Sequence, residues 1–275
     1  MIDVLKDKLN NYDNDKDKFN KLREELQLII LRLLDEYNHF RNIAFLGGTS
    51  LRILYKIRRY SEDLDFSLVN KESYSFQKII EDIDRGLTRL GLKTSFKIKK
   101  RDTAVKSAFI RFTGLLYELG LSPLKDQNIA IKFEIDENPP TAYNTEFSNL
   151  AEMTIIGIKH FDKPSLFAGK LHAVLSRPYP KGRDYFDLLW FISEKIKPNL
   201  LFLQNALEQS RGSKSEKELD INLLRLMLLE KIQDVDFAKV NEDLSPFIMD
   251  DQDRRKYSPE IFVELIERYF ISDIH

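Results

Sequence analysis

Two segments of the chain alternate polar and apolar residues with a period of two, and this pattern limits the fold more than any other feature. In the first segment, SEDLDFSL (61–68), the apolar positions on one side are Leu64, Phe66 and Leu68, and the polar positions on the other are Asp63, Asp65 and Ser67. The second segment, IAIKFEID (129–136), alternates in the same way. Successive side chains of a strand point to opposite faces of a sheet, so both segments are predicted to be strands.

Helical patterns lie between these strands. Apolar residues recur every three or four positions over 18–38 and 74–90, which predicts two amphipathic helices, with Gly91 ending the second. A short helix is expected over 49–57, with Thr49 or Ser50 as its cap. Further strands are expected over 43–48, 92–100, 104–112 and 152–158.

The character of the sequence changes beyond about residue 163. The remaining patterns are helical and show no convincing strand, with helices expected over 163–177, 183–195, 198–210, 215–231 and 258–272. We therefore expect an α+β protein with two domains. Residues 1–160 would form an α/β core with an N-terminal helix, and residues 161–275 a helical C-terminal domain.

Composition excludes several classes of protein. The chain has 43 Lys and Arg against 44 Asp and Glu, a formal net charge of −1, so it lacks the overall basic field of a nonspecific nucleic-acid binder. Two local basic runs, 56–60 and 97–101, are where RNA would contact such a chain, although runs of this kind are more often solvated faces. The absence of Cys excludes disulfides, thiolate metal ligands and cysteine catalysis.

The sequence also bears on location. Its longest apolar stretches fall short of the roughly 20 residues that a membrane-spanning helix needs. The first residues are polar with mixed charge, unlike a signal peptide. We expect a cytoplasmic protein with no membrane partner.

The segments that carry chemistry are GGTS at 47–50 and DLD at 63–65. Glycines at a strand-to-helix turn allow backbone amides to approach a phosphate, and the helix N-terminus favours an anion there. Two carboxylates at i and i+2 of a strand lie on one side, with Cα atoms roughly 6.6 Å apart. Such oxygens suit Mg²⁺ or Mn²⁺ better than zinc.

Each of these features has a plain structural interpretation when taken alone. A Gly-Gly turn is a common exit from a strand, and an acidic pair on a polar strand face is usually a solvated edge. Their order along the chain is more informative. A phosphate turn, a short helix, an acidic strand and a later strand with more acidic residues are what metal-dependent nucleotidyl transfer requires.

Two stretches resemble a known family. GGTSLR (47–52) with RRYSEDLDFSL (58–68) is similar to the first motif of the nucleotidyltransferase-fold toxins of the AbiEii/AbiGii family, which is related to the DNA polymerase β superfamily. FAGKLHAVLSRPYPKGRDYFDLLWF (167–191) resembles the Lys-bearing helix and the R-D-x-x-D block of that family. The resemblance implies a polymerase β-type α/β core with a mixed sheet, followed by a helical region.

The resemblance also implies roles for residues of the first part of the chain. The triphosphate would lie against Gly47, Gly48, Thr49 and Ser50. Asp63 and Asp65 would be catalytic and hold Mg²⁺, with NTP as substrate. A third carboxylate is expected from the strand at 129–136, where Glu134 and Asp136 share a face. We favour Glu134 because it lies in the middle of the strand, although either could be a surface carboxylate.

Further roles fall on the second stretch. Lys170 would contact the nucleotide phosphates, although a lysine on a largely apolar helix can also extend along the surface to water. Arg183 would help to bind the nucleotide, and Asp184 would act in catalysis, although an acidic residue in a first turn also stabilises the helix dipole. Asp187 could serve the same network or only the fold.

The resemblance implies an enzyme of the nucleotidyltransferase class (EC 2.7.7) that acts as the toxin of a toxin–antitoxin or abortive-infection pair. It would transfer NMP from an NTP to an acceptor hydroxyl, with the 3′ end of tRNA as the implied acceptor, and release pyrophosphate. The expected partners are NTP, RNA and a cognate antitoxin, with no DNA. Two alternatives remain: transfer to a small molecule or a protein by the same fold, or a module that binds NTP without turning it over.

Overall fold

A computed structural model describes residues 1–99, 103–152, 154–249 and 257–271. The chain divides into two compact units, and each unit is made of three separate stretches of the chain. Unit 1 consists of Met1–Lys56, Tyr60–Pro139 and Glu146–His160, and unit 2 of Ile57–Arg59, Pro140–Thr145 and Phe161–His275. Each unit has its own core of buried hydrophobic side chains.

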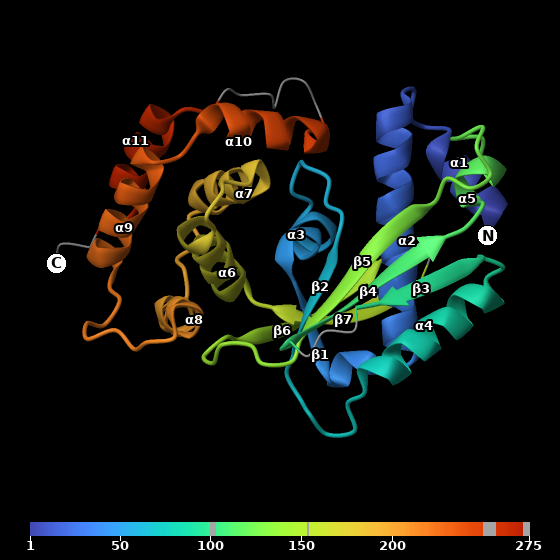
Figure 1. Ribbon diagram of the computed structural model, residues 1–275, viewed down its shortest axis with the longest axis horizontal. Helices are drawn as coiled ribbons and strands as arrows, with labels where there is room; N and C mark the ends of the chain where they lie inside the picture. The colour runs from blue at the N-terminus through green and yellow to red at the C-terminus, as the bar shows by residue number, and fades with distance from the viewer. Residues whose placement is uncertain (100–102, 153, 250–256, 272–275) are drawn as a thin grey trace. The chain divides into compact units, whose positions relative to one another are not determined.

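Unit 1 is built on a mixed sheet of seven strands (Figure 1). In chain order the strands are β1 (Ile43–Leu46), β2 (Leu64–Leu68), β3 (Thr94–Ile98), β4 (Val105–Phe112), β5 (Ile129–Asp136), β6 (Thr145–Ala151) and β7 (Ile155–Phe161). Their order across the sheet is β3-β4-β5-β2-β1-β7-β6. The two segments with the clearest alternation, which become β2 and β5, are neighbours near its centre.

The directions of the strands fix which residues meet. β2 runs parallel to β5 and antiparallel to β1, while β4 runs antiparallel to both β5 and β3. Asp65 has Glu134 as its Cα partner on β5 and Leu46 as its partner on β1. The acidic strand is therefore held between the strand that leads to the diglycine turn and the strand that carries further acidic residues.

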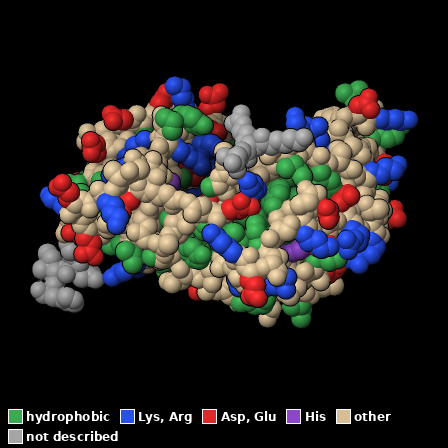
Figure 2. Space-filling view, turned by 60° about the horizontal axis from the view of Figure 1, so that its bottom comes forward, with side chains coloured by type: hydrophobic (Ala, Val, Ile, Leu, Met, Phe, Trp, Pro, Cys, Tyr) green, Lys and Arg blue, Asp and Glu red, His purple; other side chains and the backbone are tan. Residues whose placement is uncertain are grey.

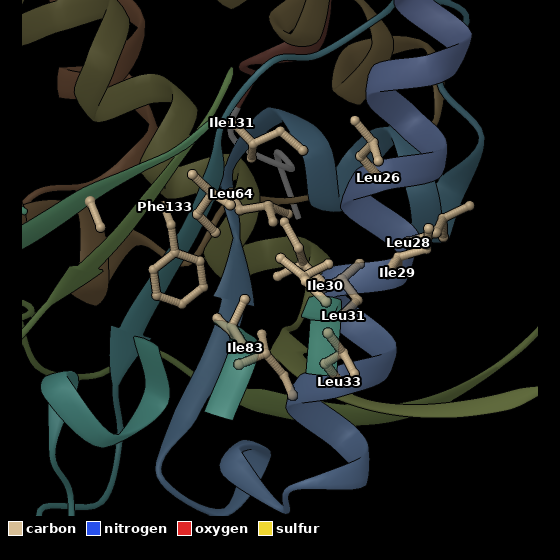
Figure 3. Close-up of a cluster of buried hydrophobic side chains, with 14 of the residues drawn as sticks. Leu26, Leu28, Ile29, Ile30, Leu31, Leu33, Leu64, Ile83, Ile131 and Phe133 are labelled. Carbon is tan, nitrogen blue, oxygen red and sulfur yellow. The ribbon is translucent and has the colours of Figure 1, made fainter. Parts of the chain in front are cut away.

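Helices α2 (Asp15–Glu36) and α4 (Phe76–Arg89) pack on the apolar side of this sheet (Figure 1). Figure 3 shows the core that they form with the central strands, in which the labelled side chains include Leu26, Ile30, Leu64, Ile83, Ile131 and Phe133. All six are buried. Burial of large aliphatic side chains stabilises a fold by roughly 1.5–3 kcal/mol each, so this side of the sheet is committed to packing. The polar side chains of β2 and β5, among them Asp65 and Glu134, lie on the opposite side.

Three shorter helices complete unit 1: α1 (Ile2–Leu9), α3 (Gly47–Tyr55) and α5 (Leu115–Glu118), with a 3₁₀ turn η1 at His39–Arg41. α3 follows β1 directly and packs against β1 and β2. Because α3 begins at Gly47, Thr49 and Ser50 lie inside its first turns, and its N-cap position is Leu46 without a side-chain cap. The prediction that Thr49 or Ser50 caps this helix is therefore wrong.

Unit 2 is helical in its long C-terminal part. Its helices are α6 (Lys163–Ser176), α7 (Gly182–Ser193), α8 (Leu200–Arg211), α9 (Ile221–Gln233), α10 (Phe237–Leu244) and α11 (Pro259–Tyr269), with a 3₁₀ turn η2 at Ser245–Phe247. Phe167 of α6 stacks on Phe191 of α7 with ring centroids 4.5 Å apart. Tyr185 of α7 meets Phe237 and Phe262 edge to face. These aromatic contacts join helices that are distant in sequence.

The α+β fold class and the helical C-terminal region are confirmed. The strand over 129–136 is found at its predicted bounds, whereas α1, β6 and α10 were not predicted. β6 lies at the edge of the sheet and its side chains are largely exposed, so it lacks a clear apolar alternation. In the face shown in Figure 2, basic and acidic side chains are interspersed, in keeping with their nearly equal numbers.

Within the described residues, no helix combines the length and the apolar composition that crossing a bilayer requires.

Candidate functional site

Unit 1 brings together three of the predicted acidic residues. Asp65 of β2 and Glu134 of β5 are partners on adjacent parallel strands, which lie about 4.8 Å apart in any sheet. Asp63 comes two residues before Asp65, just ahead of β2, where the same alternation directs it to the same side. Asp136 is the partner of Ser67 instead. The register therefore sets Glu134, and not Asp136, beside the acidic pair.

The surroundings of Asp136 differ from those of Glu134. The Oδ1 atom of Asp136 accepts a hydrogen bond from the backbone N–H of Asn138 at 2.9 Å, which fixes the turn that leaves β5. Burial raises the pKa of Asp136, and the hydrogen bond from Asn138 opposes this rise. Asp136 thus has a structural partner at the end of its strand.

Lys132 belongs to this cluster, although it was not predicted as a site residue. It lies two positions before Glu134 on the same face of β5 and forms an ion pair with that carboxylate. Burial lowers the pKa of Lys132, but the hydrogen bond to Glu134 and the charges of Glu134, Asp63 and Asp65 outweigh this effect and raise it. The sequence spacing could have identified Lys132, because residues i and i+2 of a strand lie on the same face.

The diglycine turn lies directly against the acidic pair. Gly47 has a φ of +81°, a conformation that residues with a side chain rarely adopt. A Cβ atom added to Gly47 would lie 2.5 Å from Oδ2 of Asp65. The absence of a side chain at Gly47 therefore leaves the space that the Asp65 carboxylate occupies, and this contact joins the two predicted motifs.

The two hydroxyl groups of the turn bond within unit 1. Thr49 Oγ1 donates to the backbone carbonyl of Asp63 and lies 2.9 Å from Oγ of Ser61. Ser50 Oγ donates to the carbonyl oxygen of Gly47 at 2.8 Å. Both side chains are fully buried. In this state they fix the backbone of the turn and of the acidic segment, while Gly47 and Gly48 form the start of α3, where N–H groups lack partners within the helix.

These residues suit a cation that arrives with phosphate ligands better than one held by protein alone. Among the described residues, no group of three or more His, Asp or Glu side chains is arranged to hold a metal ion. Mg²⁺ in nucleotide sites is usually bound by one or two carboxylates, with phosphate oxygens and water as its other ligands. Asp63 and Asp65 meet that requirement, and Glu134 is engaged by Lys132.

Unit 2 gathers a second group of predicted residues. The Nζ atom of Lys170 on α6 lies 3.2 Å from Oδ1 of Asp184 and 2.7 Å from Oδ2 of Asp187, both on α7. The side chain of Lys170 is 14% exposed, so its ammonium is largely held by these two carboxylates. Asp184 directs its carboxylate to Lys170 and to Arg177, which lies 2.9 Å away, and does not cap α7. Asp187 is a full member of this network.

The innermost partner of the network is Arg59. Its Nε and Nη2 atoms each lie 2.6 Å from an oxygen of Asp187, and the two side chains are 1% and 0% exposed. Burial favours the neutral form of Asp187, but the charges of Arg59 and Lys170 outweigh this effect and lower its pKa. Arg59 belongs to the basic run 56–60, so this member of the run does not form a solvated surface. Nothing in the neighbouring sequence predicts that Arg59 is buried against Asp187.

Arg183 contacts an aromatic ring of unit 2. Its guanidinium carbon lies 4.0 Å from the ring centroid of Phe247, which is a cation–π contact within unit 2. The start of α7 is held instead by the N–H of Gly182, which donates to Asp243 at 2.7 Å. The nucleotide-binding role of Arg183 stays a prediction, as do the roles of the other site residues.

The chain is similar to known proteins in sequence and in fold. A family model described as the nucleotidyl transferase AbiEii toxin of type IV TA systems matches residues 29–262. No curated protein matches the sequence. The fold is similar to that of a Helicobacter pylori protein provisionally described as a nucleotidyltransferase, with a TM-score of 0.53, 18% identity, and 90% of this chain and 91% of that chain covered.

A second solved structure, JHP933 from Helicobacter pylori, gives a TM-score of 0.52 and 17% identity, with 91% of this chain and 90% of that chain covered. At such identities the two structures show a shared fold only. The family model is more specific, because its span of 29–262 contains the acidic pair, the diglycine turn and the Lys170 network. The chain therefore belongs to the AbiEii nucleotidyl transferase toxin family of type IV toxin–antitoxin systems.

Proposed function

We propose that this protein transfers a nucleoside monophosphate from an NTP to a hydroxyl group of RNA, with the 3′ end of tRNA as acceptor. The observation that carries the proposal is the contact between the Asp65 carboxylate and Gly47, with Glu134 on the adjoining strand. It sets carboxylates for a cation beside a turn whose backbone can approach phosphates. In the reaction the acceptor hydroxyl loses its proton to solvent, its oxygen bonds to the α-phosphorus, and the bond from the α-phosphorus to the pyrophosphate oxygen breaks.

Mg²⁺, or Mn²⁺, when bound with the nucleotide, would neutralise the charge that develops on the α-phosphoryl group and on pyrophosphate. Asp63 and Asp65 would hold it, and Glu134 would be the third carboxylate once Lys132 releases it. The register favours Glu134 over Asp136 for this role.

The chain's own residues would bind and orient the substrate. The first-turn N–H groups at Gly47 and Gly48 would donate to phosphate oxygens, while the Thr49 and Ser50 hydroxyls keep the turn in shape. Lys170 would supply a positive charge to the phosphates, and Asp184 and Asp187 hold its ammonium group in place. Positioning and charge account for most of the catalysis in phosphoryl transfer of this kind.

A labelled-nucleotide assay tests the proposal. The protein is incubated with Mg²⁺, each α-labelled NTP in turn and total RNA, and label is followed into tRNA together with pyrophosphate release. Removal of the cation by EDTA and the substitution Asp65→Asn should each reduce incorporation by about 100-fold or more. Asp126→Asn is the matched control, since Asp126 is exposed on a loop of the same unit.

Other outcomes would assign a different function. Label in a small molecule or a protein would replace RNA as the acceptor, and NTP binding without pyrophosphate release would indicate a binding module. In cells we propose a cytoplasmic toxin that a cognate antitoxin restrains. Expression of the wild-type chain should then arrest growth, and Asp65→Asn should relieve the arrest.

A further inference from the structure

The face of the sheet that carries the acidic pair continues across β5, β4 and β3. The register defines rows of residues that run across these strands on that face. One row places Asp65, Glu134 and Ser107 side by side on β2, β5 and β4. Since neighbouring strands lie about 4.8 Å apart, Ser107 is roughly 10 Å from Asp65 between Cα atoms.

The next two rows on this face are basic. One contains Lys132, Phe109 and Lys97 on β5, β4 and β3. The following row contains Ala130, Arg111 and Ser95 on the same strands. Rows two residues apart along a strand are separated by roughly 6.6 Å.

Lys99 extends this arrangement just beyond β3, where its backbone N–H donates to the carbonyl oxygen of Ser107 at 2.9 Å. Lys97, Lys99 and Arg111 form what we call the basic strip. All three side chains are exposed. In the part of the chain that the structure describes, no carboxylate lies within ion-pair distance of any of them. The face is therefore divided by charge, with carboxylates on β2 and β5 and available cations on β3 and β4.

An aromatic side chain lies within the strip. Phe109 is half-buried on β4, and the Lys99 ammonium lies 5.4 Å from its ring centroid. Exposed cations around an aromatic ring are the usual features of surfaces that bind single-stranded nucleic acid, where cations contact the backbone and bases stack on rings. An acidic protein would bind through the cations and would not require the aromatic ring, so the presence of Phe109 favours RNA as the ligand of this surface.

We propose that the basic strip binds the phosphodiester backbone of a single-stranded RNA end and leads its terminal hydroxyl toward Asp65 and Glu134. The order of the rows supports this direction, because Lys132 joins the strip to the acidic pair through its ion pair with Glu134. The inference rests on the proposed function and adds to it the surface that receives the acceptor.

The test compares two triple variants with the same change of charge. Lys97→Glu/Lys99→Glu/Arg111→Glu alters the strip, and Lys6→Glu/Lys71→Glu/Lys125→Glu alters exposed lysines elsewhere in unit 1. Each set of three substitutions lowers the net charge by six, because every change replaces a positive charge with a negative one. The control also loses a cation–π contact, that of Lys125 with Tyr117, as the strip variant loses that of Lys99 with Phe109. Circular dichroism and the melting temperature verify that both variants are folded.

Binding is measured by fluorescence anisotropy with a short labelled single-stranded RNA, without NTP, over a range of salt concentrations. Each phosphate contact on a single strand contributes about 0.7 to the slope of log affinity against log salt. Loss of three contacts should lower that slope by about 2 and weaken binding by about 100-fold at 0.1 M salt, while the control variant binds as the wild type does.

Equal RNA affinity of the two variants would overturn the inference, as would a wild-type protein that does not bind the RNA. Poly-glutamate serves as a second probe: if the strip variant loses poly-glutamate but keeps RNA, the strip is a site for an acidic protein and the inference is again wrong. Because RNA binding is measured without NTP, its loss in the strip variant supports the surface even where the labelled-nucleotide assay refutes the proposed chemistry.

Discussion

The guanidinium of Arg59 and the carboxylate of Asp187 form a two-point ion pair, although 128 positions separate them in the sequence. Asp187 also lies 2.7 Å from the ammonium of Lys170. A carboxylate buried between two cations orients both of them. The Arg59–Asp187 pair therefore holds the Lys170 side chain in position. Substitution of each of the three residues can be tested for its effect on stability without an assay of nucleotide transfer.

Asp187→Asn should lower the free energy of unfolding by about 3–5 kcal/mol, because it removes the negative charge that the buried guanidinium of Arg59 contacts at two points. Urea unfolding followed by circular dichroism measures this, with the exposed Asp126→Asn as control. Replacing both partners, as in Arg59→Met with Asp187→Leu, should cost less than the sum of the single changes. A loss below about 1 kcal/mol for Asp187→Asn would show that the pair is not buried as described.

The stability of the protein should depend on pH through Asp187. Its pKa is lower in the folded state than in the unfolded state, since Arg59 and Lys170 stabilise the charged form. The stabilisation is therefore fully present above the unfolded pKa of about 4 and is lost as the pH falls through the folded pKa. The difference in unfolding free energy between wild type and Asp187→Asn should narrow below about pH 4. A constant difference from pH 7 to the acid limit would contradict this assignment.

Lys170→Met should affect catalysis more than stability. After this change Asp187 keeps Arg59 and Asp184 keeps Arg177, so each carboxylate retains a cation. We expect a stability loss of about 1 kcal/mol, smaller than that of Asp187→Asn, and a fall of about 100-fold in kcat/KM for NTP. Steady-state kinetics and thermal unfolding of the same preparations give both numbers. Normal kinetics with a large fall in Tm would make Lys170 structural.

Gly47→Ala should remove activity by displacing Asp65. The new methyl group would meet Oδ2 of Asp65 at 2.5 Å, and alanine at a φ of +81° adds a backbone cost of roughly 1–2 kcal/mol. Gly91→Ala is the matched control, because Gly91 has a φ of +76° and open space around it. Both variants should lose the stability that the backbone conformation costs, Gly47→Ala should lose more because of its clash with Asp65, and only Gly47→Ala should lose nucleotide transfer. Equal activity of the two variants would separate the turn from the acidic residues.

The periodic parts of the fold could be predicted from the sequence. IAIKFEID has one apolar face over its whole length, so β5 has the predicted bounds, and the stripe of 18–38 becomes most of α2. The periodicity of a strand predicts which side chains share a face, but it does not predict which residues are opposite each other on neighbouring strands. The choice between Glu134 and Asp136 depended on which of them lies beside Asp65, and only the pairing of β2 with β5 supplies that relation.

Residues whose partners are distant in sequence were the ones missed. Arg59 stands in a run of basic residues, and nothing nearby indicates that it is buried against Asp187. Thr49 looked like a helix cap because Gly47 and Gly48 looked like a turn, whereas the helix already begins at Gly47, so that Thr49 lies inside its first turn. Lys132, by contrast, could have been identified from its spacing to Glu134 alone.

The segment Ile57–Arg59 belongs to unit 2, while the residues on either side of it, Lys56 and Tyr60, belong to unit 1. A recombinant fragment that ends at residue 160 would retain Arg59 and lack Asp187, and the complementary fragment would have the opposite deficiency. Neither half should therefore be soluble and native on its own. When the two fragments are co-expressed, they should associate and fold together. The chain could therefore serve as a split protein whose activity reports that the two fragments have associated.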